Sequence, residues 1–193
     1  AVTQDCPRGA LSELFEATPF SYFDLTNRRL PVMFDQGHGR IVTCSSVLGL
    51  TAMRGRGAYN GTKFALEGLT DTLRMELRGQ PIHISLIEPG PILSQFRATG
   101  VKMLEKHIDI ENSIHRDKYK GVLARLKKEG PAVPFTLPPE AVLDKVIHAL
   151  EAKRPKARYY VTFPTYLFGY LKRLLPVRWL DKMLAAAGGN GKR

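Results

Sequence analysis

Residues 40–45 read RIVTCS, a short run that is rich in β-branched side chains and follows a Gly-containing turn. Such a run is typical of a strand inside a parallel sheet that is covered on both faces. Residues 82–88, IHISLIE, form a second run of this kind and end at a Pro-Gly-Pro break. Residues 157–162, ARYYVT, predict a third strand. The sequence therefore favours a parallel sheet at the centre of the fold.

Helical patterns lie between the predicted strands. Apolar residues recur at helical spacing over residues 9–34, where Pro19 interrupts the pattern, and a leucine stripe predicts a helix over 58–78. Further helices are predicted over 140–153 and 165–175. This alternation indicates an α/β fold, namely part of a Rossmann-like, doubly wound parallel sheet with crossover helices.

Three polar side chains are placed where such a sheet binds ligands, beyond the carboxyl ends of its strands. Ser46 follows the first strand, and Tyr59 and Lys63 open the next helix, where a spacing of four puts them on one face. A nearby cation lowers the pKa of a phenol from about 10, so Tyr59 is a candidate general acid/base for a carbonyl and alcohol pair. Ser46 can donate a hydrogen bond to the same substrate oxygen. A Tyr and a Lys at this spacing also occur by chance on exposed helices, so the set of three carries the hypothesis.

Three motifs occur in order along the chain: GRIVTCSS at 39–46, YNGTK at 59–63 and LIEPGPILS at 86–94. Together they resemble the short-chain dehydrogenase/reductase family, in particular its steroid- and retinol-dehydrogenase-like members. The resemblance covers roughly residues 7–96 and continues more loosely towards the C-terminus.

This resemblance implies a role for each side chain of the expected site. Tyr59 would exchange the proton, Lys63 would hold the nicotinamide ribose and lower the pKa of the tyrosine, and Ser46 would position the substrate carbonyl. The cofactor is expected to be NADP or NAD. The turn after the second strand would contact its nicotinamide end through Pro89, Gly90, Ile92 and Ser94.

The chain departs from the family pattern in two places. The stretch TPFS at 18–21 puts Thr18 where the family has an Asn, and a Thr hydroxyl can hold a water but cannot copy an amide. The family's Gly-rich phosphate loop and the residue that reads the cofactor ribose are not found in the sequence. We therefore expect a catalytic and substrate-binding half without the N-terminal cofactor half, as a fragment or a truncated product. The preference between NADP and NAD is not readable without that half.

Residues 1–193 are expected to form one domain, because a chain of this length with 44% hydrophobic residues can build a core. The formal net charge is +11, and residues 153–193 hold ten Lys and Arg against one Asp, which gives +9. A solvated basic tail and a contact with an anionic surface both explain this excess. Residues 163–193 form a basic amphipathic segment with several aromatic residues. Such a segment more often packs on the chain's own core, and the nearby aromatic residues keep peripheral membrane contact or an apolar substrate mouth open as alternatives.

Other classes of site are disfavoured. Two cysteines give no disulfide framework, and Cys44 is predicted to be a small buried hydrophobe in a reducing compartment. The sequence shows no signal peptide and no apolar run long enough to span a membrane, which favours a cytoplasmic protein with at most peripheral membrane contact. The five histidines lack ligand spacing, so no metal site is predicted. The stretch RGRG at 54–57 lacks an aromatic platform, so nucleic-acid binding is not predicted either.

The sequence thus predicts an NAD(P)-dependent oxidoreductase that interconverts a carbonyl and an alcohol of a small, apolar substrate by hydride transfer. The alternative is a catalytically inactive fragment or remnant of the same fold, associated with a membrane or a partner. Residues 92–138 are polar and weakly periodic, which fits a substrate lid or a plain charged surface loop. The resemblance further implies a homodimer built on the helix at 58–78.

Overall fold

The computed structural model describes residues 1–188, and its centre is the parallel sheet that the sequence predicts. The strands β1 (Gly39–Cys44), β2 (Ile82–Glu88) and β3 (Arg158–Tyr160) pair in that order. β1 and β2 pair along the whole of β1, whereas β3 pairs over three residues and is shorter than predicted. The α/β fold class with a parallel sheet and crossover helices is confirmed.

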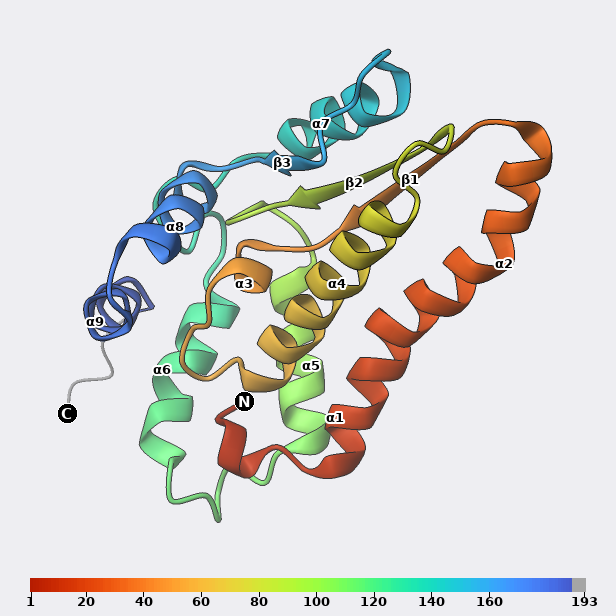
Figure 1. The fold of residues 1–193 in the computed structure, drawn as a ribbon. Helices are drawn as coiled ribbons and strands as arrows, with labels where there is room; N and C mark the ends of the chain where they lie inside the picture. Colours follow the sequence, from red (N-terminus) through yellow and green to blue (C-terminus); the bar gives the residue numbers. More distant parts are fainter. Residues whose placement is uncertain (189–193) are drawn as a thin grey trace.

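Helices connect the strands and cover both faces of the sheet, with α7 on one side and α2 and α4 on the other (Figure 1). α8 and α9 continue the chain beyond β3. In chain order the helical elements are η1 (Thr3–Asp5), α1 (Arg8–Phe15), η2 (Glu16–Phe20), α2 (Ser21–Gln36), α3 (Val47–Leu50), α4 (Gly57–Glu76), α5 (Phe96–His107), α6 (Arg116–Lys127), α7 (Glu140–Glu151), α8 (Phe163–Leu174) and α9 (Val177–Ala187).

Separate apolar clusters hold these layers together. One joins α7 to the sheet through Ile87, Ala149 and Tyr159, all of which are buried. A second joins α3 to α8 and α9, and the ring of Tyr59 packs against it. A third joins α5 to α6 around the buried side chain of Tyr119. The second cluster matters for function because it holds Tyr59 in the first turn of α4, the helix that carries two of the predicted site residues.

The interruption predicted at Pro19 within the helical region at 9–34 takes the form of a π-helical turn, and the helix is not broken there. α1, η2 and α2 follow one another without a gap, and η2 is a π-helical turn that contains Pro19. A π turn bonds residues five apart and bulges from the helix axis, so it can accommodate a residue that has no backbone N–H. The Gly-containing turn before β1 ends this region, because Gly37 ends α2 in the left-handed conformation with φ of 70°.

The prediction of a buried Cys44 is wrong, because its side chain is exposed. Cys44 ends β1, and β1 pairs only with β2 in the part of the chain that the structure describes, so this strand is less covered than the sequence pattern suggests. Residues 92–138, which the sequence shows as polar and weakly periodic, contain the short helices α5 and α6. The amphipathic segment predicted at 163–193 forms α8 and α9, and residues 189–193 lie outside the described part. None of the described helices combines the length and the hydropathy needed to cross a bilayer.

Candidate active site

Ser46 links the carboxyl ends of β1 and β2. Its hydroxyl accepts a hydrogen bond from the Leu48 N–H at 3.1 Å and donates one to the Pro89 carbonyl at 3.4 Å. The next residue strengthens this link, because the Val47 N–H also donates to the Pro89 carbonyl at 2.8 Å. Ser46 thus caps the short helix α3 and lies beside the turn that follows β2.

Tyr59 and Lys63 lie on the face of α4 that looks towards this rim. The Lys63 ammonium donates to the Cys44 carbonyl at 2.9 Å, and its Nζ lies 5.6 Å from the centre of the Tyr59 ring. The Tyr59 ring packs against the cluster that contains Val47 and Leu48, directly after Ser46. The structure therefore brings Ser46, Tyr59 and Lys63 together at the carboxyl end of β1.

The pKa of Tyr59 moves in the opposite direction from the one expected. Burial raises it, and the neighbouring Ser46 hydroxyl opposes this effect only in part. The nearby cation that favours the phenolate is Arg56, whereas the ammonium of Lys63 is engaged by the Cys44 carbonyl. Burial also lowers the pKa of Lys63. The phenol therefore holds its proton more tightly here than a free tyrosine does.

The turn after β2 is built around a glycine that has no room for a side chain. A Cβ on Gly90 would lie 2.1 Å from Oγ1 of Thr162 and 2.9 Å from Oγ1 of Thr165, and both threonines are fully buried. Pro89 and Gly90 are themselves half-buried. Ser94 lies further along, is exposed, and accepts a hydrogen bond from the Phe96 N–H at 3.3 Å.

The backbone of Ile92 is held in place by an isolated parallel bridge to Leu137. The Leu93 N–H donates to the Leu137 carbonyl at 2.9 Å, and the Leu137 N–H donates to the Pro91 carbonyl at 3.1 Å. In this pattern the N–H and C=O of Ile92 itself point away from the bridge. Neither group has a hydrogen-bond partner within residues 1–188, which leaves one donor and one acceptor free at the rim.

These groups fit the nicotinamide end of an NADP or NAD cofactor. The free donor and acceptor of Ile92 complement a carboxamide, which offers one acceptor and one donor group. Lys63 uses one hydrogen bond on the chain, so its ammonium keeps further donors for a ribose hydroxyl. Within the described residues, no three His, Cys, Asp or Glu side chains come together as a candidate metal site.

Thr18 lies in the π turn η2, and this turn packs against α4. The Thr18 carbonyl accepts a hydrogen bond from the Ser21 hydroxyl at 3.2 Å. Nearby, a Cβ added to Gly61 on α4 would lie 3.6 Å from the ring of Phe15, which is an ordinary van der Waals distance. The segment that carries Thr18 is therefore next to the helix of Tyr59 and Lys63, as the resemblance implies.

Two side chains near the candidate site were missed by sequence reasoning. The ring of Phe96, the first residue of α5, lies 5.2 Å from the Tyr59 ring. Arg56 precedes α4 and contacts Met53 Sδ at 3.5 Å. Burial and then the nearby Arg125 lower the pKa of Arg56 to about 10. The RGRG motif is the only sequence signal for Arg56, and the sequence favours no function for it.

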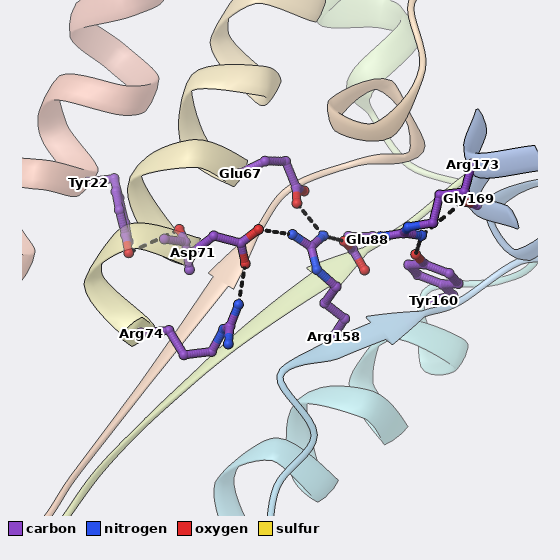
Figure 2. A network of polar contacts seen from close by, with 10 residues as sticks. Tyr22, Glu67, Asp71, Arg74, Glu88, Arg158, Tyr160, Gly169 and Arg173 are labelled. Carbon is purple, nitrogen blue, oxygen red and sulfur yellow. Dashed lines mark hydrogen bonds and ion pairs between the residues drawn. The ribbon is translucent and has the colours of Figure 1, made fainter. Parts of the chain in front are cut away.

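A charge cluster lies further along the same face of α4 (Figure 2). Arg158 binds Glu67 and Asp71 at 2.5 Å each, and it also binds Glu88 on β2. Tyr59, Lys63, Glu67 and Asp71 follow one another at intervals of four residues, so one stripe of α4 carries both the candidate site and this cluster. Burial, followed by the neighbouring Glu67, raises the pKa of Glu88 to about 8.

Comparison with known proteins agrees with this geometry. The sequence profile of the short chain dehydrogenase family matches residues 2–104, more than half of the chain. The chain belongs to this family. The match begins at residue 2, so the expected lack of the N-terminal cofactor half of a short chain dehydrogenase stays a prediction.

Two relatives and one solved structure illustrate the similarity. Uncharacterized oxidoreductase YbbO of Escherichia coli (strain K12) is 46% identical over 177 residues, which are 92% of this chain and 60% of the relative. NADPH-dependent 3-dehydrocapnine reductase of Ornithobacterium rhinotracheale is 30% identical over 185 residues, 93% of this chain and 63% of the relative. A short-chain dehydrogenase from Streptomyces avermitilis superposes with a TM-score of 0.65 at 21% identity, over 96% of this chain and 62% of that one. The chain thus spans somewhat less than two thirds of the length of these proteins.

Proposed function

We propose that the protein is a nicotinamide-dependent oxidoreductase that interconverts a carbonyl and an alcohol. One observation supports this above all: the Tyr59 phenol, the Lys63 ammonium and the Ser46 hydroxyl gather at the carboxyl end of β1. A hydroxyl, a phenol and an ammonium at one rim suit proton transfer to or from a substrate oxygen. Membership of a family of oxidoreductases adds to this support.

Each residue has a distinct task in this proposal. Ser46 donates a hydrogen bond to the substrate oxygen, and Tyr59 gives that oxygen a proton during reduction and takes it back during oxidation. The raised pKa of Tyr59 keeps its proton on the phenol at neutral pH, which suits the acid in carbonyl reduction. The nicotinamide, when bound, supplies or accepts the hydride.

NADP or NAD would be held by Lys63 and by the turn that includes Pro89, Gly90, Ile92 and Ser94. The free N–H and C=O of Ile92 support this assignment for the carboxamide, and the donors left on Lys63 support it for the ribose. The name of the 3-dehydrocapnine reductase makes NADPH the first cofactor to test. Ser94 is the weakest member of the set, because it is exposed and holds the Phe96 N–H.

An apolar substrate and a lid over residues 92–138 belong to the same proposal. The contact between Phe96 and Tyr59 supports both, because the first residue of α5 covers the phenol with an aromatic ring. α5 and α6 pack on each other and would move as one unit to admit a substrate. Phe96 is 60% exposed, so its outer side is free to contact an apolar molecule.

Peripheral contact of a cytoplasmic protein with a membrane surface is proposed for α8 and α9. Large apolar side chains are exposed there beside basic residues, a combination that suits the interface of an anionic bilayer. The exposed apolar side chains are Tyr170, Leu174, Val177, Trp179 and Met183, and the basic ones are Lys172, Arg173, Arg178 and Lys182. Co-sedimentation with anionic vesicles tests this proposal, and binding that is equal with neutral vesicles would count against it.

A homodimer is proposed on α4, and the exposed apolar residues of α4 and α2 support it. Phe64, Leu69 and Met75 are exposed on α4, and Phe23 and Leu25 are exposed on α2. Sedimentation equilibrium of the protein and of a Leu25→Glu variant tests this proposal. A monomer at all concentrations would reject it.

A second candidate function is a non-catalytic remnant of the same fold, associated with a membrane or a partner. It is favoured by Thr18, which stands where the resemblance expects an Asn. The two candidates differ in whether nicotinamide binds.

Titration with NADPH and NADH, followed by nicotinamide fluorescence, separates them. We expect saturable binding by the chain or by the protein expressed from the whole gene. A Lys63→Met change should weaken it about tenfold, the equivalent of about 1.4 kcal/mol, whereas Lys102→Met on α5 should not. Failure of both proteins to bind either nucleotide would favour the remnant.

A further inference from the structure

A cavity of about 370 Å³ lies at the outer edge of β3, between α7 and α8. It is lined by four basic residues and four tyrosines: Lys145, Lys156, Arg158, Tyr159, Tyr160, Tyr166, Tyr170 and Arg173. None of these residues belongs to the candidate active site. The absence of acidic side chains from the wall gives the cavity a strongly positive character.

Three of the four basic residues are available to a ligand. Lys145, Lys156 and Arg173 form no ion pair with a carboxylate in the part of the chain that the structure describes. Arg173 is held by hydrogen bonds to the Gly169 carbonyl at 3.0 Å and to the Tyr160 hydroxyl at 3.5 Å. These bonds fix its direction and leave further guanidinium N–H groups free.

Arg158 lines the cavity without offering its charge to a ligand, because its guanidinium is turned towards the carboxylates of Glu67, Glu88 and Asp71 (Figure 2). That cluster does not cancel the charge of the cavity. Burial raises the pKa of Glu88 to about 8, which favours its neutral form, and Arg158 and Arg74 pair with the other two carboxylates. The cluster behind the wall is therefore close to neutral, and the three free cations set the potential.

The tyrosines give the cavity an aromatic side. The ring of Tyr160 packs edge-on against Tyr166 at 5.3 Å and against Tyr170 at 6.4 Å. Gly169 makes this possible, because a Cβ there would lie 2.9 Å from the Tyr160 ring. Tyr166 and Tyr170 line the cavity and are 44% and 60% exposed, so both side chains are accessible to a ligand.

We propose that this cavity binds a phosphate group carried by an organic molecule. A phosphate monoester has a charge of about −1.5 to −2 at neutral pH, which the three cations that line the cavity can neutralise. Arg173 offers the fork geometry that suits phosphate oxygens, and lysines act as point charges beside it. The tyrosine rings accept the organic part of the ligand by stacking. The phosphate belongs to a soluble metabolite or to a lipid headgroup, and the chemistry recognised is the same.

This inference does not depend on the proposed oxidoreductase activity, and its test needs no turnover. Calorimetric titration with phenyl phosphate at about physiological ionic strength, where diffuse surface charge is largely screened, should give saturable binding. Vesicles of phosphatidylcholine with and without phosphatidic acid form the second arm. Binding in the phenyl phosphate arm assigns a soluble ligand, and binding in the vesicle arm alone assigns a lipid headgroup.

A double change, Lys156→Ala with Arg173→Ala, removes two cations from the wall. A matched change, Lys153→Ala with Arg154→Ala, removes the same charge from exposed neighbours outside the cavity. We expect the first pair to weaken binding at least about tenfold and the second less than about twofold, with both variants folded by circular dichroism. Equal losses of affinity in the two double variants would show that binding depends only on general surface charge, and this result would overturn the proposal. Absence of binding in both arms would overturn it as well.

Discussion

Arg158 on β3 binds Glu88 on β2, although 70 residues separate them in the sequence. The same guanidinium reaches Glu67 and Asp71 on α4, so one side chain ties the edge strand, its neighbour and the helix of Tyr59 together. Because Tyr59 and Lys63 lie on the same stripe of α4, the rim of the candidate site depends on this tie. The cluster therefore links the stability of the fold to the position of the chemistry.

Replacing Arg158 by Met should destabilise the protein by about 3–5 kcal/mol, because buried carboxylates would lose their cation. Urea denaturation measures this change. The matched control is Arg28→Met, which removes an exposed pair with Asp24 and should cost no more than about 1 kcal/mol. Similar costs for the two variants would contradict the role assigned to Arg158.

Glu88 should make the protein less stable as the pH rises. Its folded pKa of about 8 exceeds the ordinary value near 4.5, so the folded state holds a proton that the unfolded state has lost. The stability from this group is full below about pH 4.5 and is lost as the pH rises through about 8. A Glu88→Gln change should flatten the fall in unfolding free energy over this window by up to about 1.4 kcal/mol per pH unit. An unchanged slope in urea titrations would disprove the assignment, and the exposed Glu140→Gln change serves as the control.

Gly90→Ala should destabilise the turn beside the candidate site by about 1–3 kcal/mol, because the new methyl group would overlap the buried Oγ1 of Thr162. Thermal unfolding measures the loss. Adding Thr162→Ala should recover part of it. Gly121→Ala on α6, where a Cβ meets nothing within 4 Å, should be neutral or stabilising by up to about 1 kcal/mol. A harmless Gly90→Ala change would show that the turn is not tightly packed.

Tyr59 should ionise above the pH at which an ordinary phenol does, about 10, because burial raises its pKa. The difference in tyrosinate absorbance between the protein and a Tyr59→Phe variant isolates this one group. The cofactor-free protein should show no difference signal below about pH 9. If the proposed function holds, alcohol oxidation, which needs the phenolate, should accelerate with pH through the alkaline range. A tyrosinate signal near neutral pH would instead mean that a nearby cation lowers the pKa of Tyr59 by more than burial raises it.

Local patterns were sufficient to predict the strands and the main helix. β1 and β2 are short β-branched runs, and α4 begins and ends within two residues of its predicted bounds. The leucine stripe gave the right helix but not its buried face, because Leu66 is buried whereas Leu69 is 37% exposed. Polar residues such as Glu67 take the buried positions instead.

Features that depend on distant contacts could not be predicted. The direction of the Tyr59 pKa follows from burial in the folded chain, where Phe96 of α5 packs on its ring. The interruption at Pro19 could be predicted from the sequence, but its form, a π turn that keeps the chain helical, could not. The partners of Arg158 come from α4 and β2, 70 to 91 residues away, so a single Arg in a predicted strand gave no hint of them.

The central claim is that Tyr59 is the acid/base of a carbonyl reductase, and the most direct test is kcat/KM of a Tyr59→Phe variant. The measurement uses the protein expressed from the whole gene, with NADPH and a panel of apolar aldehydes and ketones. The account predicts a loss of about 10²–10⁴-fold, while Tyr166→Phe, a change at an exposed tyrosine, leaves activity intact. Turnover that survives Tyr59→Phe unchanged would contradict the assignment.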